Sequence, residues 1–189
     1  MTTALAVAAI AFAAVCVGCL VVLHVSPTGY RPVRNAVSEY GVGAYAGWYR
    51  AQAAFAGIAA VCLAAALAHD LDPVPRRVVG LLVVFSLARV AIGFFPTDLV
   101  GSAALTRTGA VHMALAVAAF ASIAWAASAL RASAHGTPWL GYVMIVTAVG
   151  TAAAVRGAAL RPILGLIERG FYAAFLTWIF LVSLRLAGA

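Results

Sequence analysis

The sequence predicts an all-α fold, a polytopic transmembrane bundle of six helices. Of the 189 residues, 66% are hydrophobic and only 9% are charged, and the mean hydropathy is +1.08. A small globule of this composition would have too few charges to cover its surface. Several continuous apolar runs also reach the ~18 residues typical of a membrane-spanning helix. Because the strands of a barrel alternate in hydropathy, these continuous runs favour helices.

Each predicted span corresponds to one apolar run. The first run lacks the basic start of a signal peptide and is longer than its apolar region, so we predict a retained span. The second run leads to the polar connection HDLDPVPRR, the third follows that connection, and the fourth begins directly after Arg107. The fifth and sixth runs are short and need their flanking residues to cross about 30 Å of hydrocarbon. We place the spans at residues 4–25, 45–68, 78–95, 108–130, 139–155 and 168–186, in a single integral membrane domain of residues 1–189.

Six spans place both termini on one side of the membrane, named side A, and connections one, three and five on the other side, named side B. On side A the ionisable residues lie in aqueous connections and need no functional explanation. On side B polar residues approach or enter the ends of all six spans, and arginines outnumber acids. We therefore predict a polar layer near side B. Its members are His24, Arg31, Arg34, Ser38, Glu39, Arg50, Arg89, Asp98, Arg107, His112, Arg156, Arg161, Glu168 and Arg169.

The arginines of this layer allow two interpretations. An arginine at the centre of a hydrophobic span costs at least ~2.5 kcal/mol on insertion scales, so arginines at helix ends commonly extend to the interface and contact lipid headgroups. Alternatively, they line a positive pocket that binds an anionic group such as a lipid phosphate. The protein would then bind or handle an anionic lipid or amphiphile. The candidate ligand-binding residues are Arg50, Arg89, Arg169, Glu168, Tyr45, Tyr49 and Trp48.

The aromatic candidates recur with Gln52 at helical spacing on the second span: Tyr45, Trp48 and Tyr49. Tyrosine and tryptophan at this depth usually form an interfacial belt. The alternative is that they form one wall of the proposed pocket.

A membrane-embedded metal-dependent hydrolase or transferase is a second functional class. His24, Asp98 and His112 carry metal-ligating side chains at similar depth, and Glu39 or Glu168 could complete the set. Zinc held by such ligands activates a bound water for hydrolysis. The spacing of these residues matches no recognised zinc signature.

Two further classes use the same residues. The candidate catalytic residues are His112, Asp98, Glu39 and Ser38, and a Ser38/His112/Asp98 triad would support acyl transfer. The sequence around Ser38 lacks the nucleophile-elbow motif of such enzymes. His24 and His112 could instead bind haem from two spans. A purely structural membrane protein also stays among the alternatives, and whether the protein is an enzyme stays open.

Four segments carry a resemblance to a known family: GYRPVRNAVSEYGVG, GFFPTD, TRTGAVHMALA and GLIERGFYAAFLTWIFLVSLRL. In this order they resemble the bacterial membrane family called domain of unknown function 998. The resemblance implies six spans and an N-terminus in the cytoplasm, and it brings no established activity. The positions that match the family pattern all map to side B: Pro32, Ser38, Glu39, Gly93, Pro96, Asp98, Gly109, His112, Glu168 and Arg169.

We therefore expect a multi-pass protein of the bacterial cytoplasmic membrane, with both termini on the cytoplasmic side. Abundant alanine and the use of arginine for every basic residue indicate a high-GC bacterial genome. The expected partners are membrane lipids, through an anionic headgroup, and not nucleic acid. The sequence identifies no cofactor.

Overall fold

The computed structural model describes residues 1–70, 74–99, 101–102 and 104–188. These residues form six α-helices, and no strand occurs among them. The helices are α1 (Thr2–Val25), α2 (Ala46–Ala68), α3 (Arg76–Ile92), α4 (Arg107–Ala129), α5 (Pro138–Arg156) and α6 (Leu164–Gly188). The predicted all-α class is confirmed for this part of the chain.

Most of these helices have the length and composition of membrane spans. Five of the described helical segments are long and apolar enough to cross a membrane: Thr2–Val25, Ala46–Ala68, Arg107–Ala129, Pro138–Arg156 and Arg161–Gly188. Helix α3 has 17 residues, about 26 Å at 1.5 Å per residue, slightly less than the ~30 Å of a hydrocarbon core. The protein is thus a helical protein of membrane type, and a span at α3 stays a prediction.

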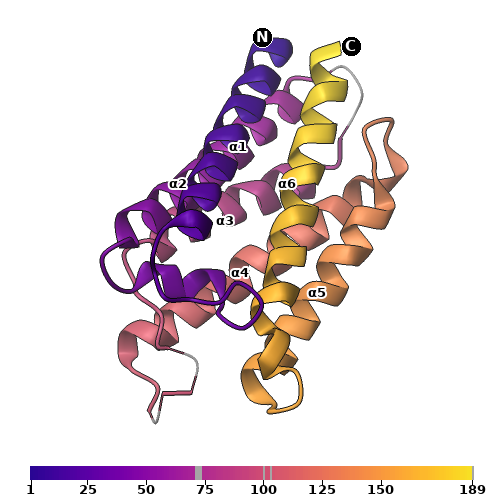
Figure 1. The fold of residues 1–189 in the computed structure, drawn as a ribbon. Coiled ribbons are helices and arrows are strands. Elements are labelled where there is room, and N and C mark those ends of the chain that lie inside the picture. The colour runs from indigo at the N-terminus through magenta and orange to yellow at the C-terminus, as the bar shows by residue number, and fades with distance from the viewer. Residues whose placement is uncertain (71–73, 100, 103, 189) are drawn as a thin grey trace.

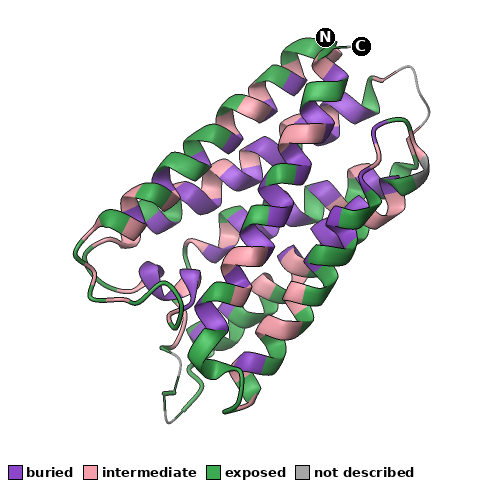
Figure 2. Cartoon of the chain, turned by 45° about the vertical axis from the view of Figure 1, so that its right-hand side comes forward, coloured by how far each residue is buried: buried purple, intermediate pink, exposed green. Residues whose placement is uncertain are grey.

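The helices form a closed ring in which neighbours along the chain are neighbours in space. Each consecutive pair of helices is in contact, and α6 closes the ring by packing against α1. Both termini lie at the same end of the bundle (Figure 1). Buried residues follow the inner faces of the helices, whereas exposed residues follow the outer faces (Figure 2). A ring of this kind brings the side-B ends of distant segments close together.

Small residues let the helices approach, and aromatic residues of α6 fill the interior. A Cβ on Gly57 of α2 would lie 2.9 Å from the carbonyl oxygen of Ser86 on α3, so this position requires glycine. The ring of Phe171 stacks on Phe120 of α4 with centroids 3.8 Å apart. Trp178, farther along α6, is fully buried. The core therefore lies along the inner face of α6.

Two predicted boundaries on side B differ from the structure. The third span was expected to reach Phe95, but α3 ends at Ile92, because Pro96 lacks an amide hydrogen and its ring restricts the preceding residue. The sixth span was expected to begin at Glu168, but α6 begins at Leu164, directly after a 3-10 turn at Arg161–Ile163. Glu168 and the residue after it consequently lie inside α6, where their side chains reach α1 and connection one.

Candidate functional site

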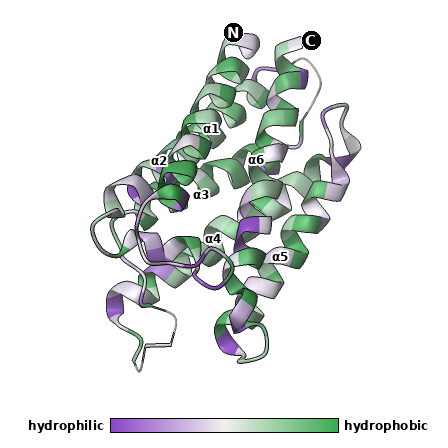
Figure 3. Ribbon diagram, in the orientation of Figure 1, coloured by the Kyte–Doolittle hydropathy of each residue, from purple (hydrophilic) through white to green (hydrophobic). Residues whose placement is uncertain are grey.

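The polar residues of side B separate into three clusters in the folded chain. Figure 3 shows many of the hydrophilic residues toward the end of the bundle away from the termini. The loop cluster consists of His24, Asn35, Glu39, Tyr40, Glu168 and Arg169. The interior cluster consists of Tyr49, Gln52, Arg89, His112 and Tyr172. The α4 cap consists of Asp98, Thr106 and Gly109.

Arg169 and His24 join α6 to α1 in the loop cluster. The Nε–H group of Arg169 donates to Nε2 of His24 at 2.6 Å, and Nδ1 of His24 donates to the carbonyl oxygen of Leu20 at 2.6 Å. Because a carbonyl only accepts and a guanidinium only donates, these two bonds fix a neutral imidazole with its hydrogen on Nδ1. His24 therefore positions Arg169 without adding to its charge.

Arg169 also holds connection one against α6. It donates to the carbonyl oxygens of Asn35 at 2.8 Å and Gly165 at 2.9 Å, and to the Tyr40 hydroxyl at 3.2 Å. A Cβ on Gly165 would overlap the backbone oxygens of connection one, so the chain passes directly over the start of α6. Most N–H groups of this guanidinium are thus used to hold the fold.

The two acids of the loop cluster accept hydrogen bonds from backbone amides. Glu168 Oε2 accepts from the amide of Val37 at 2.7 Å, and Glu39 Oε2 accepts from the amide of Ala36 at 2.8 Å. Both carboxylates are buried. Through these bonds the two acids hold connection one in its folded conformation. Partial burial, together with the nearby Glu39 carboxylate, also raises the pKa of Tyr30 in this connection.

The interior cluster is built around Arg89 of α3. Its side chain is 2% exposed and its NH2 group donates to Gln52 Oε1 at 3.0 Å. The guanidinium also stands over the ring of Tyr172 on α6, 5.3 Å from the centroid. Tyr172 was not among the predicted site residues. Its signal in the sequence is weak, because a single tyrosine in an apolar run usually only fills the core.

His112 completes the interior cluster from α4. Its Nδ1 donates to the carbonyl oxygen of Phe95 at 2.6 Å. Burial near the Arg89 guanidinium favours the neutral imidazole, in which Nε2 then carries the lone pair. Its ring lies almost parallel to that of Tyr49 on α2, with centroids 6.5 Å apart. Both side chains are 2% exposed.

Asp98 belongs to the α4 cap. Its carboxylate accepts from the amide of Thr106 at 2.9 Å and from the Thr106 hydroxyl at 2.8 Å, and that hydroxyl accepts from the amide of Gly109 at 3.0 Å. A Cβ on Gly109 would overlap the Asp98 carboxylate. An acid is favourable here because it satisfies free amides at a helix N-terminus.

The structure does not bring the candidate metal ligands together. Asp98 is hydrogen-bonded within the α4 cap. His112 is hydrogen-bonded to Phe95, and His24 is hydrogen-bonded to Arg169. No group of three or more His, Cys, Asp or Glu side chains in the described residues could hold a metal ion. Ser38 lies half-buried in the turn Val37–Gly41, and no hydrogen bond between described residues joins it to Asp98 or His112 as a triad requires.

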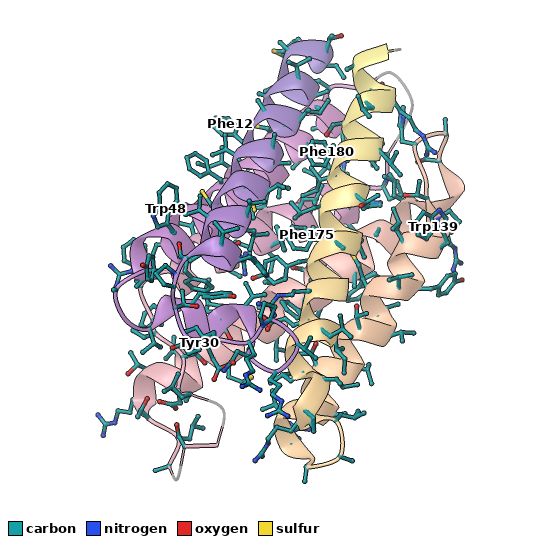
Figure 4. All side chains as sticks on the ribbon, viewed as in Figure 1. Phe12, Tyr30, Trp48, Trp139, Phe175 and Phe180 are labelled. Carbon is teal, nitrogen blue, oxygen red and sulfur yellow. The ribbon has the colours of Figure 1, made fainter. Side chains whose placement is uncertain are left out.

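The candidate residues at the start of α2 point in different directions. Tyr49 is buried, Tyr45 is half-buried, and Arg50 is exposed with its stem beside Gly93. Trp48 is 47% exposed and lies at the outer edge of the bundle in Figure 4. Only Tyr49 of these four enters the interior cluster.

A groove of about 410 Å³ lies between α1 and α6. His24 and Arg169 line it on side B, and mostly apolar side chains line the rest of its length. Phe180, which marks its far part on α6, is labelled in Figure 4. Ala173 and Thr177 are exposed lining residues, so the groove opens on the outer surface of the bundle. The other lining residues are Val17, Leu20, Val37, Tyr172 and Leu176.

Comparison with known proteins identifies the family. A family model described as "Protein of unknown function (DUF998)" matches residues 4–185. The chain belongs to this family. The resemblance seen in the sequence is thereby confirmed. Searches of curated proteins and of solved structures found no match.

Proposed function

We propose that this DUF998 protein binds an anionic amphiphile in the groove between α1 and α6. The acyl chain lies along the groove, and the headgroup lies beside Arg169 on side B. The observation that carries the proposal is an outward-facing apolar groove that has an arginine at one end.

The dimensions of the groove suit one acyl chain of one leaflet. Its volume of about 410 Å³ falls in the ~300–1,000 Å³ range of small-molecule sites. Arg169 and Phe180 lie about 16 Å apart along α6 at 1.5 Å per residue. Half of a ~30 Å hydrocarbon core is about 15 Å. An acyl chain anchored at Arg169 would therefore end near the middle of the bilayer.

The charge at the side-B end favours an anionic headgroup. Arg169 faces a neutral His24, and the nearby Glu168 carboxylate offsets only part of its charge. Arg31 and Arg34 are exposed in connection one, which is tied to the start of α6 by a bond from the amide of Leu166 to the carbonyl oxygen of Val33 at 3.0 Å. Clusters of arginines at the membrane surface attract anionic lipids.

Lipid occupancy tests the proposal directly. The protein is reconstituted in nanodiscs of equal parts phosphatidylglycerol and phosphatidylcholine, and retained lipids are counted by native mass spectrometry. Ala173→Trp fills the groove at an exposed position and is expected to reduce retained phosphatidylglycerol roughly ten-fold, a loss of about 1.4 kcal/mol. Ala152→Trp, an equivalent change at an exposed position of α5, is the matched control. Equal phosphatidylglycerol retention in both variants would refute the groove as the site.

We also infer that all six helices cross the bacterial cytoplasmic membrane with both termini in the cytoplasm, so that the groove faces the outer leaflet. The support is the ring of consecutive neighbours and the common end of the termini. Ala134→Cys in connection four and Ala158→Cys in connection five are both exposed positions. An impermeant maleimide on intact cells is expected to label residue 158 alone. Labelling of residue 134 alone would reverse the orientation.

A further inference from the structure

The interior cluster contains a buried cation, Arg89, that forms no direct ion pair within the described part of the chain. Arg89 is 2% exposed, donates to Gln52 Oε1 and also interacts with the Tyr172 side chain. No carboxylate within the described chain lies at ion-pair distance from its guanidinium. Glu168 is near enough to interact electrostatically, but its Oε2 accepts from the amide of Val37. An isolated charge is among the costliest groups to bury, so Arg89 requires a further partner.

Four buried side-chain atoms of the cluster lack a hydrogen-bond partner among the described residues: Tyr49 Oη, Gln52 Nε2, Arg89 Nε and His112 Nε2. Buried polar atoms in folded proteins are almost always partnered. Contacts bring these side chains together, because Arg89 bonds to Gln52 and Tyr49 stacks on His112. Tyr49 and Gln52 also share one face of α2 at i, i+3 spacing. The four atoms can therefore share a single ligand.

The chemistry of these atoms specifies the ligand. Arg89 Nε and Gln52 Nε2 can only donate hydrogen bonds. In the neutral imidazole of His112, the ring hydrogen is on Nδ1, which donates to Phe95, so Nε2 can accept one. The Tyr49 hydroxyl can do either. A matching ligand has acceptor oxygens, one O–H group for His112 and a single negative charge opposite Arg89.

We propose that the interior cluster binds a small monovalent oxyanion that retains one O–H group, the class that includes hydrogencarbonate and dihydrogen phosphate. The four side chains that would hold it are each at most 2% exposed, so the ligand is enclosed by α2, α3 and α4. Tyr172 connects this site to the groove, because it lines the groove and also faces Arg89. The site does not depend on lipid binding.

Binding of ¹³C-hydrogencarbonate to the full-length protein in detergent, followed by NMR, tests the site. We expect saturable binding, with ¹³C-formate at least ten-fold weaker because formate has no O–H group for His112. Arg89→Met is expected to weaken hydrogencarbonate binding at least ten-fold. His112→Phe is expected to remove the preference over formate. Arg131→Met, at an exposed arginine on side A, is the matched control and should bind like the wild type.

A second variant covers the case in which Arg89→Met does not fold. Tyr49→Phe removes only the unpartnered hydroxyl and should still weaken binding. The proposal is overturned if the wild type binds neither hydrogencarbonate nor phosphate saturably, or if the cluster variants bind both as the wild type does. Ala173→Trp, which fills the groove, should leave hydrogencarbonate binding unchanged. The two proposals can therefore fail separately: loss of the oxyanion site would not affect the lipid proposal, and loss of the lipid site would not affect the oxyanion proposal.

Discussion

Arg169 and Arg89 show how differently two side-B arginines are used. Arg169 directs its donors to His24, Asn35, Gly165 and Tyr40 and holds two helices and a connection together. Arg89 donates to Gln52, interacts with Tyr172 and lies in the bundle interior. Arg169 therefore holds the fold with most of its donors and keeps one N–H group for the proposed headgroup, whereas Arg89 has an unpartnered Nε for the proposed oxyanion.

Thr106 gives a prediction at the scale of one residue. Its hydroxyl accepts from the amide of Gly109 and donates to Asp98, so Thr106→Ala breaks two bonds at the start of α4. Losing a helix cap costs ~0.5–2 kcal/mol, which corresponds to a fall in Tm of roughly 1–8 °C for a domain of this size. Thr106→Ser keeps the hydroxyl and should melt close to the wild type. Identical melting of the alanine and serine variants in detergent would contradict this role.

Two contacts between elements position the side-B residues: connection one packs on the start of α6, and α2 packs closely against α3. Connection one is held over the start of α6 by Arg169, by Glu168 and by the bond from Leu166 to Val33. Helices α2 and α3 meet at Gly57, where the Ser86 carbonyl occupies the space of a side chain. Both features bring polar groups from distant parts of the sequence to side B.

Arg169→Lys is expected to loosen connection one. A lysine ammonium cannot reproduce the fork of donors that Arg169 directs at four partners. Trypsin cleavage after the exposed Arg34 should then accelerate, roughly ten-fold if the lost contacts are worth about 1.4 kcal/mol. Peptide mass spectrometry gives the rates, and Arg161→Lys at an exposed position is the control. Equal cleavage rates in the two variants would count against a holding role for Arg169.

Two glycine substitutions test the contact between α2 and α3. Gly57→Ala places a Cβ against the Ser86 carbonyl and should lower Tm, whereas Gly80→Ala in α3 meets no atom within 4 Å. Alanine favours a helix by up to ~1 kcal/mol over glycine, so Gly80→Ala should melt at the same temperature or higher. Thermal unfolding of both variants in one detergent makes the comparison. A stabilised Gly57→Ala variant would show that the helices are less closely packed than described.

At the scale of the whole molecule, the number and approximate bounds of the helices were predictable, because continuous apolar runs are local properties of the sequence. The convergence of polar residues on side B was also predictable, because successive spans alternate in direction and connections one, three and five therefore share one side. Their division into three clusters could not be predicted, because it depends on helix rotation. Trp48 and Tyr49 are adjacent, yet one is exposed and the other is buried. Likewise, contact between Arg169 and His24 depends on how α6 packs against α1.

The central functional claim is that the groove between α1 and α6 binds an anionic amphiphile with its headgroup at Arg169. A cryo-electron microscopy map of the protein in nanodiscs rich in phosphatidylglycerol tests it most directly. We expect elongated density along Leu20, Leu176 and Phe180 that ends in a headgroup beside Arg169. A well-resolved map in which this groove holds no ordered lipid, while other outer surfaces of the bundle do, would contradict it.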